Sequence, residues 1–249
     1  MNSKTDTSNL EKEYSALYER IHSPLAAFYK RELELANSAC FVQPLGDGEI
    51  REFTWTEVGQ QVRSMAAHLR SLELAPGSNI ALLSTNTAYW IMADLAIWMA
   101  GHCSVPLYPV LTAHSIRQIM EHSESKLIFV GKLAGWESMR DGVPEGLPVI
   151  SLPLAPVAAE ESAGQWSDIV ENTPALTESP DVNIEDVATI IYTSGTTGMP
   201  KGVMHSFRNM AVVGTLAGEM YEVMSADRKI SYLPLAHVAE RAAVEINQL

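Results

Sequence analysis

A chain of 249 residues in which 47% of the side chains are hydrophobic can bury the core of one large or two small domains. Its formal net charge of −13 argues against a nucleic-acid-binding surface. Cys40 and Cys103 are isolated and give neither a metal-binding spacing nor a disulfide framework, so a reducing, cytoplasmic location is expected.

The first part of the chain predicts alternating strands and helices. The polar start MNSKTDTSN has no apolar core of a signal peptide, and residues 11–35 form a helical pattern that Pro24 interrupts. The motif TWTE at residues 54–57 is a capping box that opens a helix to about Leu72. Strands are expected at 39–43, 50–53, 79–84, 103–107 and 126–130, and further helices at 87–100 and 113–122. Apolar strands that alternate with helices predict an α/β fold with a twisted, mostly parallel sheet flanked by helices.

The most hydrophobic stretch, residues 88–100, predicts a buried helix. It contains Asp94 and is shorter than the roughly 20 residues that a bilayer span requires. The sequence therefore indicates no transmembrane segment, which leaves membrane contact of a peripheral kind only.

The middle of the chain is typical of a connection between two units. Residues 133–187 hold 11 acidic side chains and one basic side chain, and prolines are frequent there, so we expect an irregular, solvated segment with one clear strand at 149–152. The expected organisation is a first α/β subdomain at 1–132, an acidic Pro-rich connection at 133–186 and the start of a second subdomain at 187–249. In this second part, strands are expected at 187–191, 203–205 and 229–233, and helices at 208–224 and from 236 onward.

Residues 192–202, YTSGTTGMPKG, predict a loop that binds phosphate. The apolar run 187–191 leads into it as a buried strand, and its glycines allow tight bends and close approach of the backbone. Successive backbone N–H groups in such a loop form an anion-binding concavity, which hydroxyls and one ammonium group complete. The loop lacks the Gly-Lys-Ser/Thr of the common nucleotide loop and the spacing of G-x-G-x-x-G and G-x-S-x-G.

This loop resembles the signature of the adenylate-forming enzymes, which include acyl-CoA synthetases, luciferases and peptide-synthetase adenylation domains. The resemblance implies that Gly195 and Gly198 let backbone N–H groups approach the β- and γ-phosphates of ATP. The hydroxyls and the charge that complete this phosphate cradle come from Ser194, Thr196, Thr197 and Lys201. Thr193 is implied as a contact of the Mg²⁺ ion, and Lys201 as a catalytic residue that neutralises developing charge.

A second segment, SYLPLAHVAER at 231–241, carries a further candidate. His237 and Glu240 at a spacing of three share a helix face, which is compatible with a metal pair or with a satisfied polar cluster. The segment resembles the long-chain fatty acyl-CoA synthetases in particular, where it borders the acyl and carboxylate site. The resemblance therefore makes His237 a candidate catalytic residue.

The resemblance also extends to residues 54–72, 81–101 and 105–131, and it implies the N-terminal part of the acyl-CoA synthetase fold. The implied reaction activates a long-chain fatty acid with ATP and Mg²⁺ and transfers it to coenzyme A. The alternatives are a ligase for a medium-chain, aryl or amino acid, and a non-catalytic module that binds ATP or an acyl group. The oligomeric state is not indicated.

We expect a fragment, because the adenylate-forming enzymes run well beyond 500 residues and their acidic magnesium ligand, ribose-binding aspartate and C-terminal lysine have no counterpart here. The 249-residue chain alone is predicted to be catalytically inactive and poorly soluble, since a cut sheet exposes strand edges and apolar surface. The measurement is acyl-dependent ATP–pyrophosphate exchange. A rate above that of a Lys201→Ala control would contradict the prediction.

Overall fold

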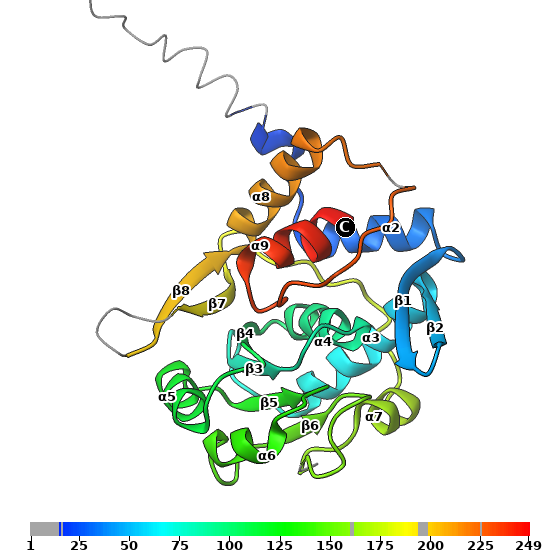
Figure 1. Ribbon diagram of the computed structural model, residues 1–249. Helices are drawn as coiled ribbons and strands as arrows, with labels where there is room; N and C mark the ends of the chain where they lie inside the picture. Colours follow the sequence, from blue (N-terminus) through cyan, green and yellow to red (C-terminus); the bar gives the residue numbers. More distant parts are fainter. Residues whose placement is uncertain (1–14, 16, 160–161, 194–198, 225) are drawn as a thin grey trace, which may run out of the picture.

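The computed structural model describes residues 15, 17–159, 162–193, 199–224 and 226–249. Within them lies a six-stranded sheet of order β6-β5-β3-β4-β7-β8 (Figure 1). The strands are β3 (Asn79–Leu83), β4 (Cys103–Leu107), β5 (Leu127–Val130), β6 (Val149–Ser151), β7 (Val187–Thr193) and β8 (Lys201–Ser206). All neighbouring pairs are parallel except β7 and β8, which are antiparallel. The predicted α/β class with a mostly parallel sheet is confirmed.

The sheet is covered on both faces because successive side chains of a strand point to opposite sides. In β3, Ile80 and Leu82 join one apolar core, while Ala81 and Leu83 join another. The first core contains α3 (Trp55–Ser71), α4 (Ala88–Met99) and α7 (Trp166–Asn172), and the second contains α5 (Ala113–Ser123) and α6 (Trp136–Met139). The continuous apolar runs in the strands follow from this double burial.

Helix α4 is apolar on all sides, and every one of its residues is buried. Trp90 and Trp98 have no exposed surface, and Thr87 caps the helix by accepting a hydrogen bond from the Trp90 N–H. The predicted buried helix is therefore confirmed. Among the described residues, none of the helices combines the length and hydropathy needed to cross a membrane.

The amino-terminal elements pack against α3 and α4. The predicted interruption at Pro24 is confirmed: helical residues at 17–20 are followed by a break at 21–23, and α2 (Pro24–Glu34) then begins with Ser23 as its cap. The strands expected at 39–43 and 50–53 are found as β1 (Ala39–Gly46) and β2 (Glu49–Thr54), which pair as an antiparallel hairpin. Helix α3 then opens with the predicted capping box, in which Thr54 accepts from the Glu57 N–H and the Glu57 carboxylate accepts from Thr54.

The middle segment is more ordered than its sequence suggests. Helices α6 and α7, a 3-10 turn η1 (Arg140–Gly142) and the sheet strand β6 lie within it, and Trp136 and Trp166 anchor it in the two cores. Its acidic side chains among the described residues are all exposed, in agreement with a solvated surface. Strands from all three predicted ranges share the one sheet, and their division into units stays a prediction.

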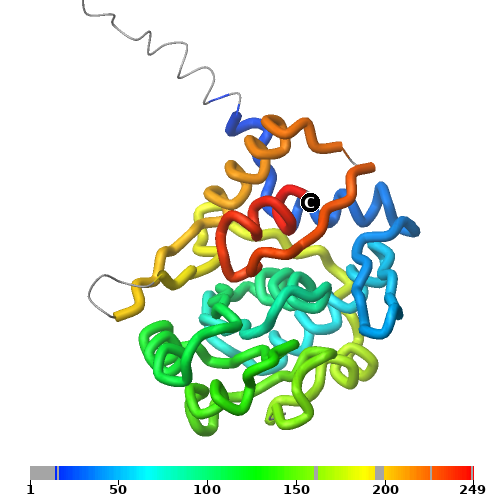
Figure 2. The backbone as a smooth tube through the Cα atoms, in the orientation of Figure 1, coloured from blue at the N-terminus to red at the C-terminus, as the bar shows by residue number. Residues whose placement is uncertain are grey.

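The carboxyl-terminal part contains α8 (Phe207–Met220), α9 (Val238–Glu240), a π-helical turn η2 (Arg241–Glu245) and a 3-10 turn η3 (Ile246–Gln248). Figure 2 shows its last residues beside α8 and α2, where the Arg31 Nε donates to the Leu249 carbonyl. The predicted strand at 229–233 is wrong. Its backbone groups bond to side chains instead, Tyr232 N–H to Glu240 and Leu233 C=O to Asn86, so it joins no described strand.

The capping box at Thr54 gives a direct test of how this helix begins. Thr54→Ala should lower the free energy of unfolding by about 1 kcal/mol, because it leaves helix N–H groups without an acceptor. Thr54→Ser keeps the hydroxyl and should cost less than half as much. Urea unfolding followed by circular dichroism measures both, and equal losses in the two variants would contradict the capping role.

Candidate functional site

The two strands that flank the predicted phosphate loop, β7 and β8, pair in an antiparallel arrangement. Thr193, the last residue of β7, pairs with Lys201, the first residue of β8, and both side chains are exposed. The hydroxyl of Thr193 and the ammonium of Lys201 therefore lie at the same end of the hairpin. The other loop candidates, Ser194, Gly195, Thr196, Thr197 and Gly198, lie outside the described residues.

Helix α5 supports both strands from one side. Nδ1 of His122 lies 2.7 Å from the Tyr192 hydroxyl, and the two rings lie edge to face with their centroids 5.6 Å apart. One turn earlier, Gln118 donates to the Met199 sulfur at 3.1 Å. Burial raises the pKa of Tyr192, so this phenol stays protonated and can donate to His122.

Gly202 is required at its position by close packing. A Cβ there would lie 2.8 Å from Ile190 Cγ2 and 3.1 Å from Tyr192 Cζ. The glycine in Pro-Lys-Gly is thus explained by contact between neighbouring strands.

The carboxyl ends of parallel strands bring further residues to the same edge. Ser104 of β4 pairs with Thr189 of β7, and by this register Tyr108, just after β4, lies beside the end of β7 at Thr193. The Tyr108 and His237 rings also lie edge to face, with their centroids 6.5 Å apart. In open α/β sheets ligands bind outside the carboxyl ends of the strands, and this is where Thr193 and His237 lie.

His237 is exposed and precedes α9 rather than lying on it. Its Nδ1 accepts from the Ala239 N–H at 3.1 Å, which makes it the N-cap of the helix. With Nδ1 engaged, Nε2 is the ring atom left to face a ligand. Glu240 points elsewhere, accepting from the Ser231 hydroxyl and the Tyr232 N–H at 2.9 Å. The pair therefore does not share a ligand, and Glu240 belongs to a satisfied polar cluster.

Asn86 holds the His237 segment against the sheet, and sequence reasoning missed it. It follows β3, donates to the Ser231 hydroxyl at 2.7 Å and to the Leu233 carbonyl at 2.6 Å, and accepts from the Leu235 N–H at 2.9 Å. Its position just past a strand at this edge was the available signal. Its partners lie about 150 residues away in sequence, so no local pattern identified them.

The described residues fit a nucleotide phosphate better than a complete metal site. A hydroxyl and an ammonium group at one hairpin end suit phosphate oxygens. Mg²⁺ is usually held by one or two carboxylates together with substrate phosphates. The described part of the chain has no cluster of three His, Cys, Asp or Glu side chains that could hold a metal. Thr193 thus fits as one ligand that phosphate oxygens would supplement.

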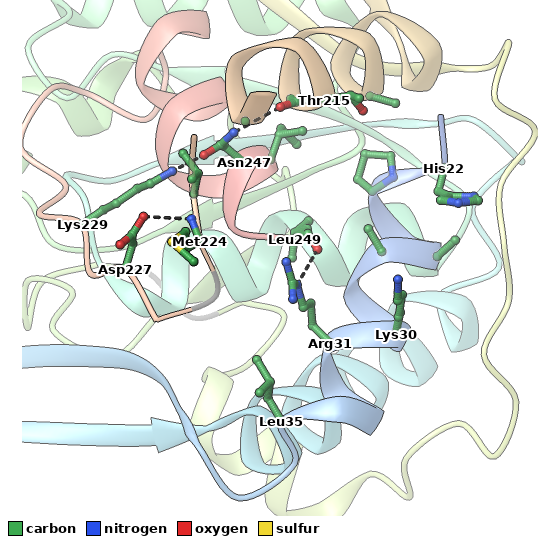
Figure 3. A pocket seen from close by; sticks show the side chains of 18 of the residues that line it. His22, Lys30, Arg31, Leu35, Thr215, Met224, Asp227, Lys229, Asn247 and Leu249 are labelled. Atoms are coloured by element: carbon green, nitrogen blue, oxygen red, sulfur yellow. Dashed lines mark hydrogen bonds between the residues drawn. The ribbon is translucent and has the colours of Figure 1, made fainter. Parts of the chain in front are cut away.

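The larger of the two cavities described lies elsewhere. It has a volume of about 940 Å³ and is lined by α2, α8 and the carboxyl-terminal residues (Figure 3). In it Lys229 donates to the Ala243 carbonyl at 2.9 Å and Asn247 donates to the Gly214 carbonyl at 3.1 Å. Thr193, Lys201 and His237 do not line it.

Residues 32–247 match the family described as AMP-binding enzyme, which accounts for most of the chain. The chain belongs to the AMP-binding enzyme family. The structure agrees with this family in fold. It superposes on a long-chain-fatty-acid-CoA ligase (FadD1) from Archaeoglobus fulgidus with a TM-score of 0.75 at 20% identity, over 90% of this chain and 44% of that one.

Curated relatives of this AMP-binding chain are CoA ligases and synthetases. It is 32% identical to the peroxisomal long chain acyl-CoA synthetase 6 of Arabidopsis thaliana, over 79% of this chain and 30% of the relative. It is also 32% identical to 3-[(3aS,4S,7aS)-7a-methyl-1,5-dioxo-octahydro-1H-inden-4-yl]propanoyl:CoA ligase of Rhodococcus jostii, over 78% of this chain and 40% of the relative. The chain thus spans less than half the length of these relatives.

Substitution of Asn86 tests how the His237 segment is held. Asn86→Ala removes three hydrogen bonds and leaves the Leu235 N–H without its acceptor, so we expect a loss of about 1–3 kcal/mol in the free energy of unfolding. Asn86→Asp keeps the acceptor and loses the donors, and it should fall between wild type and Asn86→Ala. Urea unfolding gives the three values, and an unchanged value in Asn86→Ala would contradict the assignment.

Proposed function

We propose that the protein containing this chain activates a long-chain fatty acid with ATP, first as acyl-AMP and then as acyl-CoA. The observation that carries the proposal is that Thr193 pairs with Lys201 at the end of β7 while the His237 ring contacts Tyr108, just past the neighbouring strand β4, in a chain of the AMP-binding family. The curated relatives named as acyl-CoA synthetases support the ligase class.

The first half-reaction joins the carboxylate to the α-phosphorus of ATP and releases pyrophosphate. Its main demands on the protein are positioning and stabilisation of phosphate charge. Lys201 supplies a positive charge at the hairpin end for the β- and γ-phosphates, and Thr193 supplies a hydroxyl. Thr193 would be one ligand of a Mg²⁺ ion, which would help to neutralise the phosphate charge.

The acyl carboxylate is assigned to the side of His237. The His237 ring lies edge to face with the ring of Tyr108, the residue that follows β4, and its Nδ1 is engaged in capping α9. Nε2 is then the atom that contacts the carboxylate or the developing adenylate. In the second half-reaction the thiol of coenzyme A attacks the acyl carbon and AMP leaves with the electron pair of the acyl–phosphate bond.

The choice of a long acyl chain rests on the YLPLAH segment and on several relatives named for long-chain substrates. A relative that is also 32% identical is named for a polycyclic propanoyl substrate. The identity of the acid is therefore what the experiment has to decide. A medium-chain, aryl or amino acid is the second candidate. We place the protein in the cytoplasm, where peripheral contact with a membrane surface would give it access to a poorly soluble fatty acid substrate.

The test uses the full product of the gene that encodes this chain, with ATP, Mg²⁺, coenzyme A and a panel of acids from benzoate to palmitate. We expect palmitate to give the highest kcat/KM. Lys201→Ala should lower kcat/KM for acyl-AMP formation about 10²-fold, since it removes one charge that faces the phosphates. His237→Ala should also lower the rate, with its larger effect on the acid.

Lys126→Ala is the matched control, because Lys126 is also an exposed lysine but lies just before β5, at the opposite, amino edge of the parallel strands. Its activity should equal that of wild type. Highest turnover with an aryl or amino acid would overturn the substrate assignment. Nucleotide binding without adenylate formation from any acid would favour the non-catalytic binding module.

A further inference from the structure

Arg241 forms a buried polar cluster that the proposed reaction does not use. Its side chain has no exposed surface, and the same holds for the Asp94 and Glu245 side chains that pair with it. The guanidinium also lies against the rings of Trp90 and Trp98, at 5.4 and 5.1 Å from their centroids. A fully buried charge of this kind is costly unless several partners satisfy it.

The bonds of Arg241 join four parts of the chain. Its Nε donates to Glu245 at 2.9 Å within η2, and one terminal nitrogen donates to Asp94 in α4. That nitrogen also donates to the Ser104 hydroxyl of β4 at 3.0 Å, and the other donates to the Thr189 hydroxyl of β7 at 2.6 Å. Its backbone N–H donates to the His237 carbonyl at 3.1 Å.

These contacts connect the two segments of the candidate site. Thr189 lies four residues before Thr193 on β7, the strand that enters the phosphate loop. His237 lies four residues before Arg241, within one helical turn. Arg241 thus links the two segments: its guanidinium bonds to the strand that enters the loop, and its backbone N–H bonds to His237.

The charges of the cluster do not balance if both carboxyl groups are ionised. Two carboxylates and one guanidinium would leave a net negative charge in a fully buried site. Across the described ranges of the chain, no hydrogen-bond donor reaches the buried atoms Asp94 Oδ1 and Glu245 Oε1, so both have room for a proton. Burial and the neighbouring Asp94 raise the pKa of Glu245 well above its usual range.

The other titratable groups around the cluster do not supply the missing positive charge. Cys103 begins β4, and burial raises the pKa of its thiol to about 12, which keeps it neutral. His205 lies on β8, and burial together with Arg241 lowers its pKa, which also favours the neutral form near pH 7. Charge balance therefore falls to the two carboxyl groups.

We propose that Arg241 is a positioning residue that holds the His237 segment against β7, and that Glu245 is protonated and shares its proton with Asp94. The buried cluster of Arg241, Asp94 and Glu245 is then electrically neutral. The positioning of the two site segments rests on the proposed function, whereas the shared proton does not. In this arrangement Asp94 is the counter-ion of Arg241, and Glu245 is the neutral partner.

Infrared difference spectroscopy of the full gene product at pH 7 tests the proton. Wild type should show the carbonyl band of a protonated carboxylic acid, and Glu245→Gln should lack it. Asp94→Asn should also lack it, because Glu245 must then ionise to balance Arg241. Glu121→Gln, an exposed glutamate on α5, is the control that keeps the band. Absence of the band in wild type, or its persistence in both cluster variants, would overturn the proposal.

Unfolding gives a second readout. Each single variant keeps one carboxyl group for Arg241 and should fold, while Asp94→Asn combined with Glu245→Gln leaves a buried unpaired guanidinium and should not fold. A raised pKa in the folded state means that the native protein binds more protons than the unfolded chain. Wild-type stability should therefore fall as pH rises from the ordinary glutamate pKa toward the raised value, and Glu245→Gln should lose this slope. The shared proton would be contradicted if the stability losses of the two single variants simply added up in the double variant. It would also be contradicted if Glu245→Gln kept the wild-type slope of stability against pH.

Thr189→Val tests the positioning role without removing the charge pair. It keeps the shape but removes the hydroxyl that accepts from Arg241 and donates to the Ser104 carbonyl, so the free energy of unfolding should fall, and kcat for acyl-AMP formation, measured well below the unfolding transition, should fall as well. Thr189→Ser keeps the hydroxyl and should restore the rate. Equal kcat in wild type, Thr189→Val and Thr189→Ser would contradict the positioning role of Arg241. No adenylation by wild type would instead count against the proposed function and leave the infrared and unfolding tests standing.

Discussion

The arrangement of the candidate site depends on the buried guanidinium of Arg241. Asp94, Ser104, Thr189 and Glu245 meet it from α4, β4, β7 and η2, and the rings of α4 enclose it. Such a cluster stabilises little beyond a well-packed apolar core, but removing one partner is expensive because an unpaired buried charge remains. Its effect is therefore to determine which segments lie side by side. Here these are the segment that contains His237 and β7, the strand that enters the predicted phosphate loop.

Around this point the sheet sets the rest of the geometry. Parallel pairing brings the ends of β4 and β7 to one edge, and Asn86 after β3 holds the His237 segment over it. The exposed hydroxyl and ammonium of Thr193 and Lys201 then face the same edge as the His237 ring. In the proposed reaction, phosphate and carboxylate would meet at this edge, as adenylation requires.

Local signals in the sequence predicted most of the fold. The TWTE capping box fixed the start of α3, and the apolar run at 88–100 identified a buried helix. The strand expected at 229–233 failed because its backbone groups bond to Asn86 and Glu240, contacts that hydrophobic alternation does not encode. Asn86 and Arg241 escaped prediction for the same reason, since their partners lie up to about 150 residues away. The loop composition indicated phosphate, while residues 194–198 lie outside the described part of the chain.

The central claim is that Thr193 and Lys201 hold the phosphates of ATP at the carboxyl edge of the sheet. A crystal structure of the full gene product with a non-hydrolysable ATP analogue and Mg²⁺ tests it most directly. The account predicts phosphate oxygens within hydrogen-bond distance of Lys201 Nζ, about 2.7–3.2 Å, with the α-phosphorus turned toward His237. A nucleotide bound in the cavity between α2 and α8, or one whose phosphates leave Lys201 in solvent, would contradict it.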